Sequence, residues 1–315
     1  MGSSSGLSST FHPSRSLNGA VGGPYTLTRR RTNWLIRRDT VVGSRAYTSL
    51  PGVKILWINP LGTSAYDSPM ADLIRQIKEP RTTVELVSLK MNATLDNLEY
   101  RTLEALVVRE TIELSRHAAA NGFDGVVIGC FSDPALLEAR EISGDVVVVA
   151  PCEASLQVVT RLCNRFSVIV GQEFWIYRIT QRVREYGLQH KLASMRSIDC
   201  PVPQMQSDPA ITKGRIAVAA RKAIEEDGAE AIVLGCTIEF GLFQELQASL
   251  DVPVIDPLFA SLKACEFAAG LKKAYGWKPS RIGSCQAPSE SDLSRFGLFT
   301  GAPPIGNTIV LSASR

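Results

Sequence analysis

Short apolar runs recur along the central part of the chain, and segments of helical periodicity separate them. The runs lie at 53–58, 126–128, 146–149, 167–170, 232–234 and 252–255. Continuous apolar runs of this length are typical of parallel strands that are buried on both faces, because helices cover both sides of such a sheet. The pattern therefore predicts an α/β protein built from βαβ units.

One segment of the chain is repeated, at an offset of 106 residues. Residues 122–156 and 228–262 are identical at thirteen of 35 aligned positions without a gap. In each copy a helix precedes an apolar run, and a Gly-Cys pair, a second helix and a second apolar run follow it. A repeat of this kind indicates a duplicated structural unit. We predict two Rossmann-like parallel-sheet halves related by a pseudo-twofold axis, with the active site in the cleft between them.

Two cysteines occupy equivalent positions of the repeat, Cys130 in the first copy and Cys236 in the second. Each follows the end of a predicted strand, and open parallel sheets bind ligands beyond the carboxyl ends of their strands. A pseudo-twofold axis makes equivalent positions face each other across a shared cleft. We expect the two thiols to point into one pocket from opposite sides.

A pair of facing thiols is suited to racemisation at an acidic carbon. One group removes the proton from one face of the carbon while the other delivers a proton to the opposite face, and the reverse reaction exchanges their roles. Each cysteine precedes a predicted helix, whose N–H groups favour negative charge, so we expect a lowered thiol pKa. The same N–H groups can hold the oxygen on which the charge of the carbanion accumulates. This chemistry needs no cofactor.

A lone cysteine at the end of a strand is more often small core filler than a catalyst. The match of two cysteines across the repeat favours catalysis for that pair. The remaining cysteines have no such match and are interpreted as filler: Cys152, Cys163, Cys200, Cys265 and Cys285. No Cys-x-x-Cys occurs and the three His form no metal-spaced cluster, so no zinc site is expected. No Gly-rich nucleotide-binding motif occurs in the sequence.

Three motifs resemble the aspartate/glutamate/hydantoin racemase superfamily, and most closely its hydantoin racemase branch. "GCFSDPALLEARE" resembles the first cysteine motif of that branch, "EDGAEAIVLGC" the second, and "WINP" the opening strand with its substrate-side Asn59. The resemblance runs from about Val53 to Tyr275. It implies a cofactor-independent racemase or epimerase that acts on a hydantoin-like or amino-acid-like small molecule.

The resemblance also implies roles for individual residues. Cys130 and Cys236 are the acid/base pair. Four further residues hold the substrate oxygens, the last three mainly through backbone N–H groups: Asn59, Ser132, Asp133 and Thr237. Read from the residues alone, Asp133 and Glu239 fit equally well as acids at the start of a helix.

Two loops depart from the family pattern, and both are expected to border the pocket: residues 61–67 and residues 171–175. In the second loop, Glu173 is compatible with a contact to a ureido group and Trp175 with a contact to an aromatic substituent. Surface positions are equally compatible with both side chains.

Other functions remain open at this stage. One is a maleate-type cis–trans isomerase of the same superfamily, in which one cysteine attacks as a nucleophile and the other handles protons. A malonate-type decarboxylase fits less well, because its pattern keeps one cysteine. Another is a non-enzymatic α/β clamp that binds a small anion, which leaves the match of both thiols unexplained.

Charge separates a leader from the body of the chain. The first 50 residues contain seven Arg, no Lys and one acid, so they carry more positive charge than the +3 of the whole chain. They lack the apolar block of a secretory signal and resemble a mitochondrial presequence with a processing site near Arg45. A plastid targeting sequence and a disordered leader of a cytoplasmic protein remain open. The body is mildly acidic, which gives no reason to expect a nucleic-acid partner.

We divide the chain into four parts. These are residues 1–50 as a presequence or disordered leader, residues 51–152 with 258–275 as the first half, residues 153–257 as the second half, and residues 278–315 as a peripheral tail rich in Gly, Pro and Ser. We expect a homo-oligomer that acts on a small molecule, with no metal and no cofactor. No apolar stretch reaches the length of about 18 residues that a membrane span requires, so no membrane partner is expected.

Overall fold

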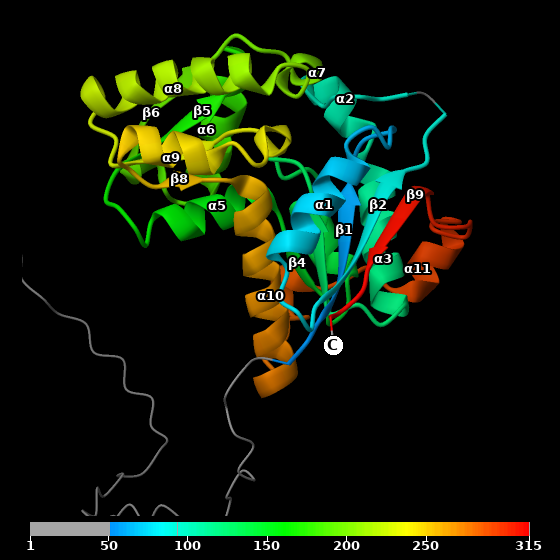
Figure 1. Ribbon diagram of the computed structural model, residues 1–315. Coiled ribbons are helices and arrows are strands. Elements are labelled where there is room, and N and C mark those ends of the chain that lie inside the picture. The colour runs from blue at the N-terminus through cyan, green and yellow to red at the C-terminus, as the bar shows by residue number, and fades with distance from the viewer. Residues whose placement is uncertain (1–50, 93, 315) are drawn as a thin grey trace, which may run out of the picture. The chain divides into compact units, whose positions relative to one another are not determined.

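The computed structural model describes residues 51–92 and 94–314, and the expectations for residues 1–50 lie outside this part of the chain (Figure 1). The first of two sheets has the strand order β4-β3-β1-β2-β9. All neighbours in it are parallel except β2 and β9, which are antiparallel. Its strands are β1 (Lys54–Asn59), β2 (Thr83–Leu89), β3 (Gly125–Ile128), β4 (Val147–Val149) and β9 (Ile305–Leu311).

The second sheet has the order β6-β5-β7-β8 and is parallel throughout. Its strands are β5 (Phe166–Val170), β6 (Leu192–Ser197), β7 (Ala231–Leu234) and β8 (Val254–Ile255). The first four strands of each half are therefore arranged in the same way, with the first strand between the second and the third and the fourth at one edge. The predicted α/β fold with two parallel sheets is confirmed, and the shared strand order agrees with the duplication read from the sequence.

Helices connect the strands and cover both sheets. Five helices connect or follow the strands β1 to β4: α1 (Asp67–Ile77), α2 (Arg101–Ala105), α3 (Val108–Ala120), α4 (Leu136–Ile142) and α5 (Pro151–Val159). The strands β5 to β8 are connected or followed by α6 (Trp175–Glu185), η1 (Gln189–Lys191), α7 (Val202–Met205), α8 (Pro209–Glu225), η2 (Thr237–Glu239), α9 (Phe243–Leu250) and α10 (Pro257–Tyr275). The segment η3 (Gly283–Cys285) and α11 (Glu290–Arg295) follow. Within the described residues, no helix is long and apolar enough to cross a membrane.

The two halves exchange a helix. α5 follows the first sheet but contacts β7 and β8, whereas α10 follows the second sheet but contacts β3, β4 and α5 (Figure 1). α10 begins at Pro257, where the carboxylate of Asp256 accepts the N–H of Leu258, and it ends before Gly276, whose φ of 73° suits glycine. One apolar cluster therefore includes side chains from both sheets and from both exchanged helices. The exchange holds the two halves on either side of a common cleft.

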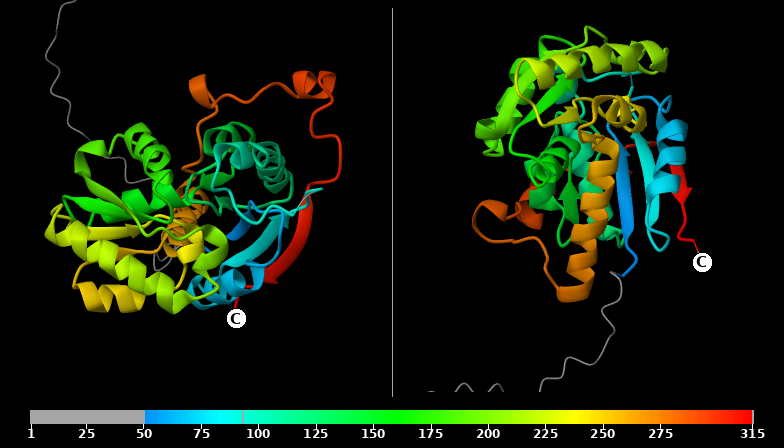
Figure 2. Two further views of the ribbon diagram at one scale, coloured as in Figure 1. Left: turned by 90° about the horizontal axis from the view of Figure 1, so that it is seen from above. Right: turned by 60° about the vertical axis from the view of Figure 1, so that its left-hand side comes forward.

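The C-terminal segment differs from the expected peripheral tail. β9 pairs with β2, from Val84–Leu311 to Leu89–Ile305, and forms the fifth strand of the first sheet. Figure 2 shows this red strand along the outer edge of the cyan β2. The alternating pattern of burial in β9 suits an edge strand with one face toward the protein. The Gly, Pro and Ser residues that suggested a peripheral tail are concentrated before β9, in a stretch that is mostly exposed.

A glycine precedes each cysteine of the repeat because the turn presses against the neighbouring strand. The N–H of Gly129 donates to the carbonyl oxygen of Ile58 at 2.8 Å, and the N–H of Gly235 donates to that of Ile169 at 2.7 Å. A Cβ on Gly129 would lie 2.9 Å from the same Ile58 oxygen. A Cβ on Gly235 would overlap the Ile169 carbonyl. Backbone atoms cannot yield as a flexible side chain can, so each strand end accepts only glycine.

This packing makes a prediction about stability. Gly235→Ala should lower the free energy of unfolding by about 1–3 kcal/mol, because the added methyl group overpacks the turn. Gly214→Ala is the matched control, since a Cβ at this position of α8 would meet nothing within 4 Å. It should raise the free energy of unfolding by about 0.5–1 kcal/mol, because alanine has the higher helix propensity. Equal stability of the two variants in urea denaturation would contradict this account of the turn.

Candidate active site

A cleft lies beyond the carboxyl ends of β1, β3 and β7, between the two halves. Its walls are formed by Asn59, Pro60, Leu61, Asn97, Leu98, Glu99, Gly129, Cys130, Phe131, Ser132, Trp175, Arg178, Val202, Gly235, Cys236, Thr237 and Ile238. The structure thus brings both cysteines of the repeat to one cleft, together with every predicted substrate-binding residue except Asp133. The described residues contain no group of three or more His, Cys, Asp or Glu side chains that could hold a metal ion.

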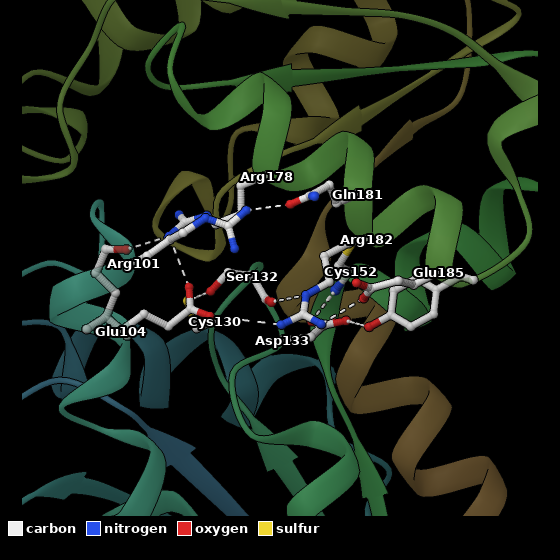
Figure 3. Close-up of polar contacts among 12 residues, drawn as sticks. Arg101, Glu104, Cys130, Ser132, Asp133, Cys152, Arg178, Gln181, Arg182 and Glu185 are labelled. Atoms are coloured by element: carbon white, nitrogen blue, oxygen red, sulfur yellow. Dashed lines mark hydrogen bonds and ion pairs between the residues drawn. The ribbon is translucent and has the colours of Figure 1, made fainter.

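The two cysteine turns have different local structures. The sulfur of Cys130 lies 3.2 Å from the hydroxyl of Ser132, in a loop where Asp133 and Ala135 both have positive φ, 51° and 57°. Left-handed backbone is costly for these residue types, so surrounding contacts must hold this loop. One such contact comes from the second half, where Nε of Arg182 donates to the carbonyl of Ser132 at 2.9 Å (Figure 3).

Cys236 begins a short 3-10 turn that Glu239 closes. The backbone N–H of Glu239 pairs with the side chain of Cys236, and the carboxylate of Glu239 accepts the N–H of Cys236 at 3.2 Å. This is a capping box with a thiol in place of the usual hydroxyl. Glu239 is fully buried, and burial raises its pKa to about 8. It therefore acts as the acid at the start of a helical turn, which is the role that the residues alone suggested for it.

Burial determines the ionisation of both thiols. It raises the pKa of Cys130, although hydrogen bonds from Ser132 oppose the shift, and it raises the pKa of Cys236 well above the ordinary value despite a backbone N–H from Ile238. A charge on Cys130 also disfavours a charge on Cys236, as expected for two thiols at one cleft. The expected lowering of the thiol pKa is wrong in direction, because the loss of hydration outweighs the helical N–H groups.

Asp133 has a structural position rather than the predicted substrate-binding one. Its carboxylate accepts the N–H groups of Cys152 and Glu153, both at 2.8 Å, and the hydroxyl of Tyr186 at 2.7 Å. Its own backbone N–H already donates to the carbonyl of Cys130 at 3.0 Å, so it is not available to a substrate oxygen. Asp133 caps α5 and links it to α6 through Tyr186. Burial raises its pKa to about 7 in spite of these hydrogen bonds.

Asn59 lines the cleft, but its amide nitrogen is directed elsewhere. Nδ2 donates to the carboxylate of Asp67 at 2.7 Å and contacts the carbonyl oxygen of Thr63 at 3.4 Å. The remaining group of the side chain is the carbonyl oxygen, which is an acceptor. Asn59 therefore offers an acceptor rather than a donor to the cleft, and its predicted contact with a substrate oxygen stays a prediction.

Several cleft residues carry polar atoms that have no hydrogen-bond partner in the part of the chain that the structure describes. Buried atoms without a hydrogen bond include Nε1 of Trp175, Nε of Arg178 and Oγ1 of Thr237. Nη1 of Arg178 donates to the Leu98 carbonyl at 3.2 Å and to the carboxylate of Glu104 at 3.0 Å, which Figure 3 shows close to Cys130. Unpaired buried polar groups are uncommon and suggest a ligand that pairs with them.

Sequence reasoning did not identify Arg178, which belongs to no motif and reaches the cleft only because α6 begins at the end of β5. For Trp175 the sequence left a cleft position and a surface position open, and the structure places this residue in the cleft lining. Glu173 is exposed and accepts the hydroxyl of Ser197 at 2.8 Å, away from the cleft lining.

The two thiols should differ in reactivity. Cys130 is partly exposed, whereas Cys236 is 8% exposed and has the more strongly raised pKa. Thiolates react and thiols do not, and a raised pKa leaves less thiolate at every pH below it, so alkylation at either residue should accelerate as the pH rises toward 9. Iodoacetamide should therefore modify Cys130 faster than Cys236 at every pH below 9.

Peptide-resolved mass spectrometry measures the rate at each cysteine separately. The exposed Cys285 serves as the internal reference for an accessible thiol. Faster alkylation at Cys236 than at Cys130, or rates that do not depend on pH, would contradict the described burial of the pair.

The chain is similar to known proteins over the region that forms the cleft. The family model for Asp/Glu/hydantoin racemases matches residues 55–265. The hydantoin racemase of Rhizobium meliloti is 32% identical over 231 residues, which cover 73% of this chain and 93% of that protein. The hydantoin racemase of Paenarthrobacter aurescens is 32% identical over 239 residues, covering 76% and 98%.

Among solved structures, allantoin racemase from Klebsiella pneumoniae superposes with a TM-score of 0.69 at 30% sequence identity, covering 76% of this chain and 94% of that one. The region that the family model matches contains both cysteine turns and the strands around the cleft. The family match ends before η3, α11 and β9.

Proposed function

The chain belongs to the Asp/Glu/hydantoin racemase family, and from this premise we propose that it racemises a 5-substituted hydantoin by proton transfer between the substrate carbon and two cysteines, Cys130 and Cys236. The observation that carries the proposal is the position of these two thiols, at equivalent points of a duplicated unit and on the walls of one cleft. The family's activity as a racemase is shared by relatives that match most of this chain.

Each thiol has one of two roles at a time. One sulfur, as a thiolate, takes the proton from one face of the carbon, and the other, as a thiol, delivers its proton to the opposite face. The reaction leaves the protonation states exchanged, so the reverse reaction starts from the other cysteine. Burial suits this chemistry, because a thiolate whose pKa is raised is a stronger base toward a weakly acidic carbon.

Charge that develops on the carbonyl next to the reacting carbon needs hydrogen-bond donors. Thr237 lines the cleft beside Cys236, and its buried hydroxyl has no hydrogen-bond partner among the described residues. A donor that is already held in a buried site stabilises developing charge without reorganisation. We assign this hydroxyl to the substrate oxygen, whereas the family resemblance gave Thr237 the same partner mainly through its backbone N–H.

A polar substituent suits the rest of the cleft. The unpaired N–H groups of Trp175 and Arg178 are donors, and Glu99, whose pKa is raised by burial, supplies a carboxyl group on the same wall. A ureido group offers one carbonyl acceptor and several N–H donors to such a set. The similarity to the Klebsiella allantoin racemase supports the same choice, since allantoin is a hydantoin with a ureido group at carbon 5.

Single replacement of each cysteine tests the two-base proposal. Cys130→Ser and Cys236→Ser should each lower the racemisation rate of allantoin by several orders of magnitude, because a hydroxyl is far too weak a base near neutral pH. Each variant can still exchange the reacting hydrogen of one enantiomer with heavy water through its remaining thiol. The two variants should differ in the enantiomer that they exchange, as followed by NMR on each pure enantiomer.

Cys163→Ser is the matched control, since this cysteine lies outside the cleft lining and should leave the rate unchanged. Near wild-type racemisation by either cleft variant would refute the two-base proposal. Full turnover of a malonate by Cys130→Ser would favour the decarboxylase instead, because its pattern keeps one cysteine.

A further inference from the structure

We propose that the C-terminal strand β9 is a working part of the cleft: Asn307 fixes the buried carboxylate of Asp67, and Asp67 fixes the side chain of Asn59 with its carbonyl oxygen available to a ring N–H of the substrate. The three residues form one chain of hydrogen bonds, here called the relay, from the edge of the sheet to the cleft. Asn307 and Asp67 act here as positioning residues, since neither lines the cleft. The choice of a ring N–H as the bound group rests on the proposed function.

The relay consists of two short hydrogen bonds to one carboxylate. Nδ2 of Asn307 donates to Oδ2 of Asp67 at 2.9 Å, and Nδ2 of Asn59 donates to Oδ1 of the same residue at 2.7 Å. Asp67 is fully buried and Asn59 is 1% exposed. A carboxylate removed from water needs hydrogen-bond donors, and here two side-chain amides, from β1 and β9, supply one to each oxygen.

The carboxylate also determines which way the amide of Asn59 points. An ionised carboxylate only accepts hydrogen bonds, so an amide oxygen turned toward it would be repelled. Asp67 is the first residue of α1, where the N–H groups of the helix favour a negative charge. With its nitrogen held between Asp67 and Thr63, Asn59 has only its oxygen left for the cleft. The cleft is thereby provided with an acceptor at the end of β1.

The local structure of β9 is adapted to reach Asp67. The register between β2 and β9 shifts between Val87 and Leu89, opposite the start of β9. A Cβ at Gly306 would lie 2.8 Å from the Leu89 carbonyl oxygen, so glycine permits the close approach that places the next residue, Asn307, against Asp67. The N–H of Lys90 donates to the carbonyl of Pro304 at 2.8 Å and fixes the entrance to the strand.

Asn307 lies beyond the region that the family model matches, which ends at residue 265. The strand replaces solvent at the open edge of β2 and supplies the second donor that the buried carboxylate needs. Without β9, Oδ2 of Asp67 loses its hydrogen-bond donor among the described side chains. The carboxylate that orients the amide of Asn59 is then no longer held in one position. The result is a loss of selectivity for substrates with a ring N–H, in addition to any loss of stability.

Hydantoin itself, without a 5-substituent, is the probe, because it is achiral and its binding does not depend on racemisation. Isothermal titration calorimetry compares it with its N1-methyl and N3-methyl derivatives. The wild-type protein should bind hydantoin at least about tenfold more tightly than one of the two derivatives, the difference expected from one lost hydrogen bond that leaves a buried acceptor unpaired. Asn307→Leu should reduce this preference toward equal affinity.

Asn307→Thr retains a hydroxyl donor on a strand and should keep most of the preference. Val310→Thr, at an exposed position of the same strand, is the matched control and should leave it unchanged. Should Asn307→Leu not fold, Asp67→Asn provides the second test, because an amide at this position no longer forces the orientation of Asn59.

An unchanged preference in folded Asn307→Leu or Asp67→Asn overturns the inference, as does a wild-type protein with no preference between hydantoin and either derivative. Failure of the proposed function is a different result. It appears as hydantoins that bind with the Asn307-dependent preference but do not exchange the hydrogens at carbon 5 in heavy water.

Discussion

The cleft depends on the contact between each Gly-Cys turn and the strand beside it. Gly129 and Gly235 donate to the carbonyls of Ile58 and Ile169, and neither turn has room for a Cβ. These contacts place a cysteine directly beyond β3 and β7, beside the ends of the neighbouring strands β1 and β5. The exchange of α5 and α10 between the sheets then keeps the two halves packed together. A proton-transfer pair on one carbon requires this kind of fixed geometry, because misplacement by about 1 Å costs large factors in rate.

In the proposed reaction, burial has opposite effects on the two tasks of the thiols. It disfavours the thiolate that begins the reaction, yet it makes that thiolate a stronger base once formed. The repeat places an acid at equivalent positions, Asp133 and Glu239, and both are buried with raised pKa values, about 7 and about 8. One caps α5 and the other closes the turn of Cys236, so the duplicated acids hold the cysteine turns in different ways.

The sequence was sufficient to predict the features that show up as local patterns of residues or in both copies of the internal repeat. Apolar runs and the repeat predicted the two parallel sheets and the cysteines at their ends. Features that depend on a distant partner could not be predicted in this way. Asp133 was assigned to the substrate because its partners Cys152 and Tyr186 are recognisable only in the folded chain. The pairing of Asn307 with Asp67 spans 240 residues, and the alternation in β9 was masked by the Gly, Pro and Ser residues before it.

The central claim is that protons reach the two faces of the substrate carbon from two different thiols. The most direct test follows the wild-type protein acting on one pure enantiomer of allantoin in heavy water, with the spontaneous reaction subtracted. At early times the account predicts that the newly formed enantiomer carries deuterium at carbon 5, while the recovered starting enantiomer still carries hydrogen. Product that retains the original hydrogen, with deuterium appearing in the recovered substrate, would show that a single base serves both faces.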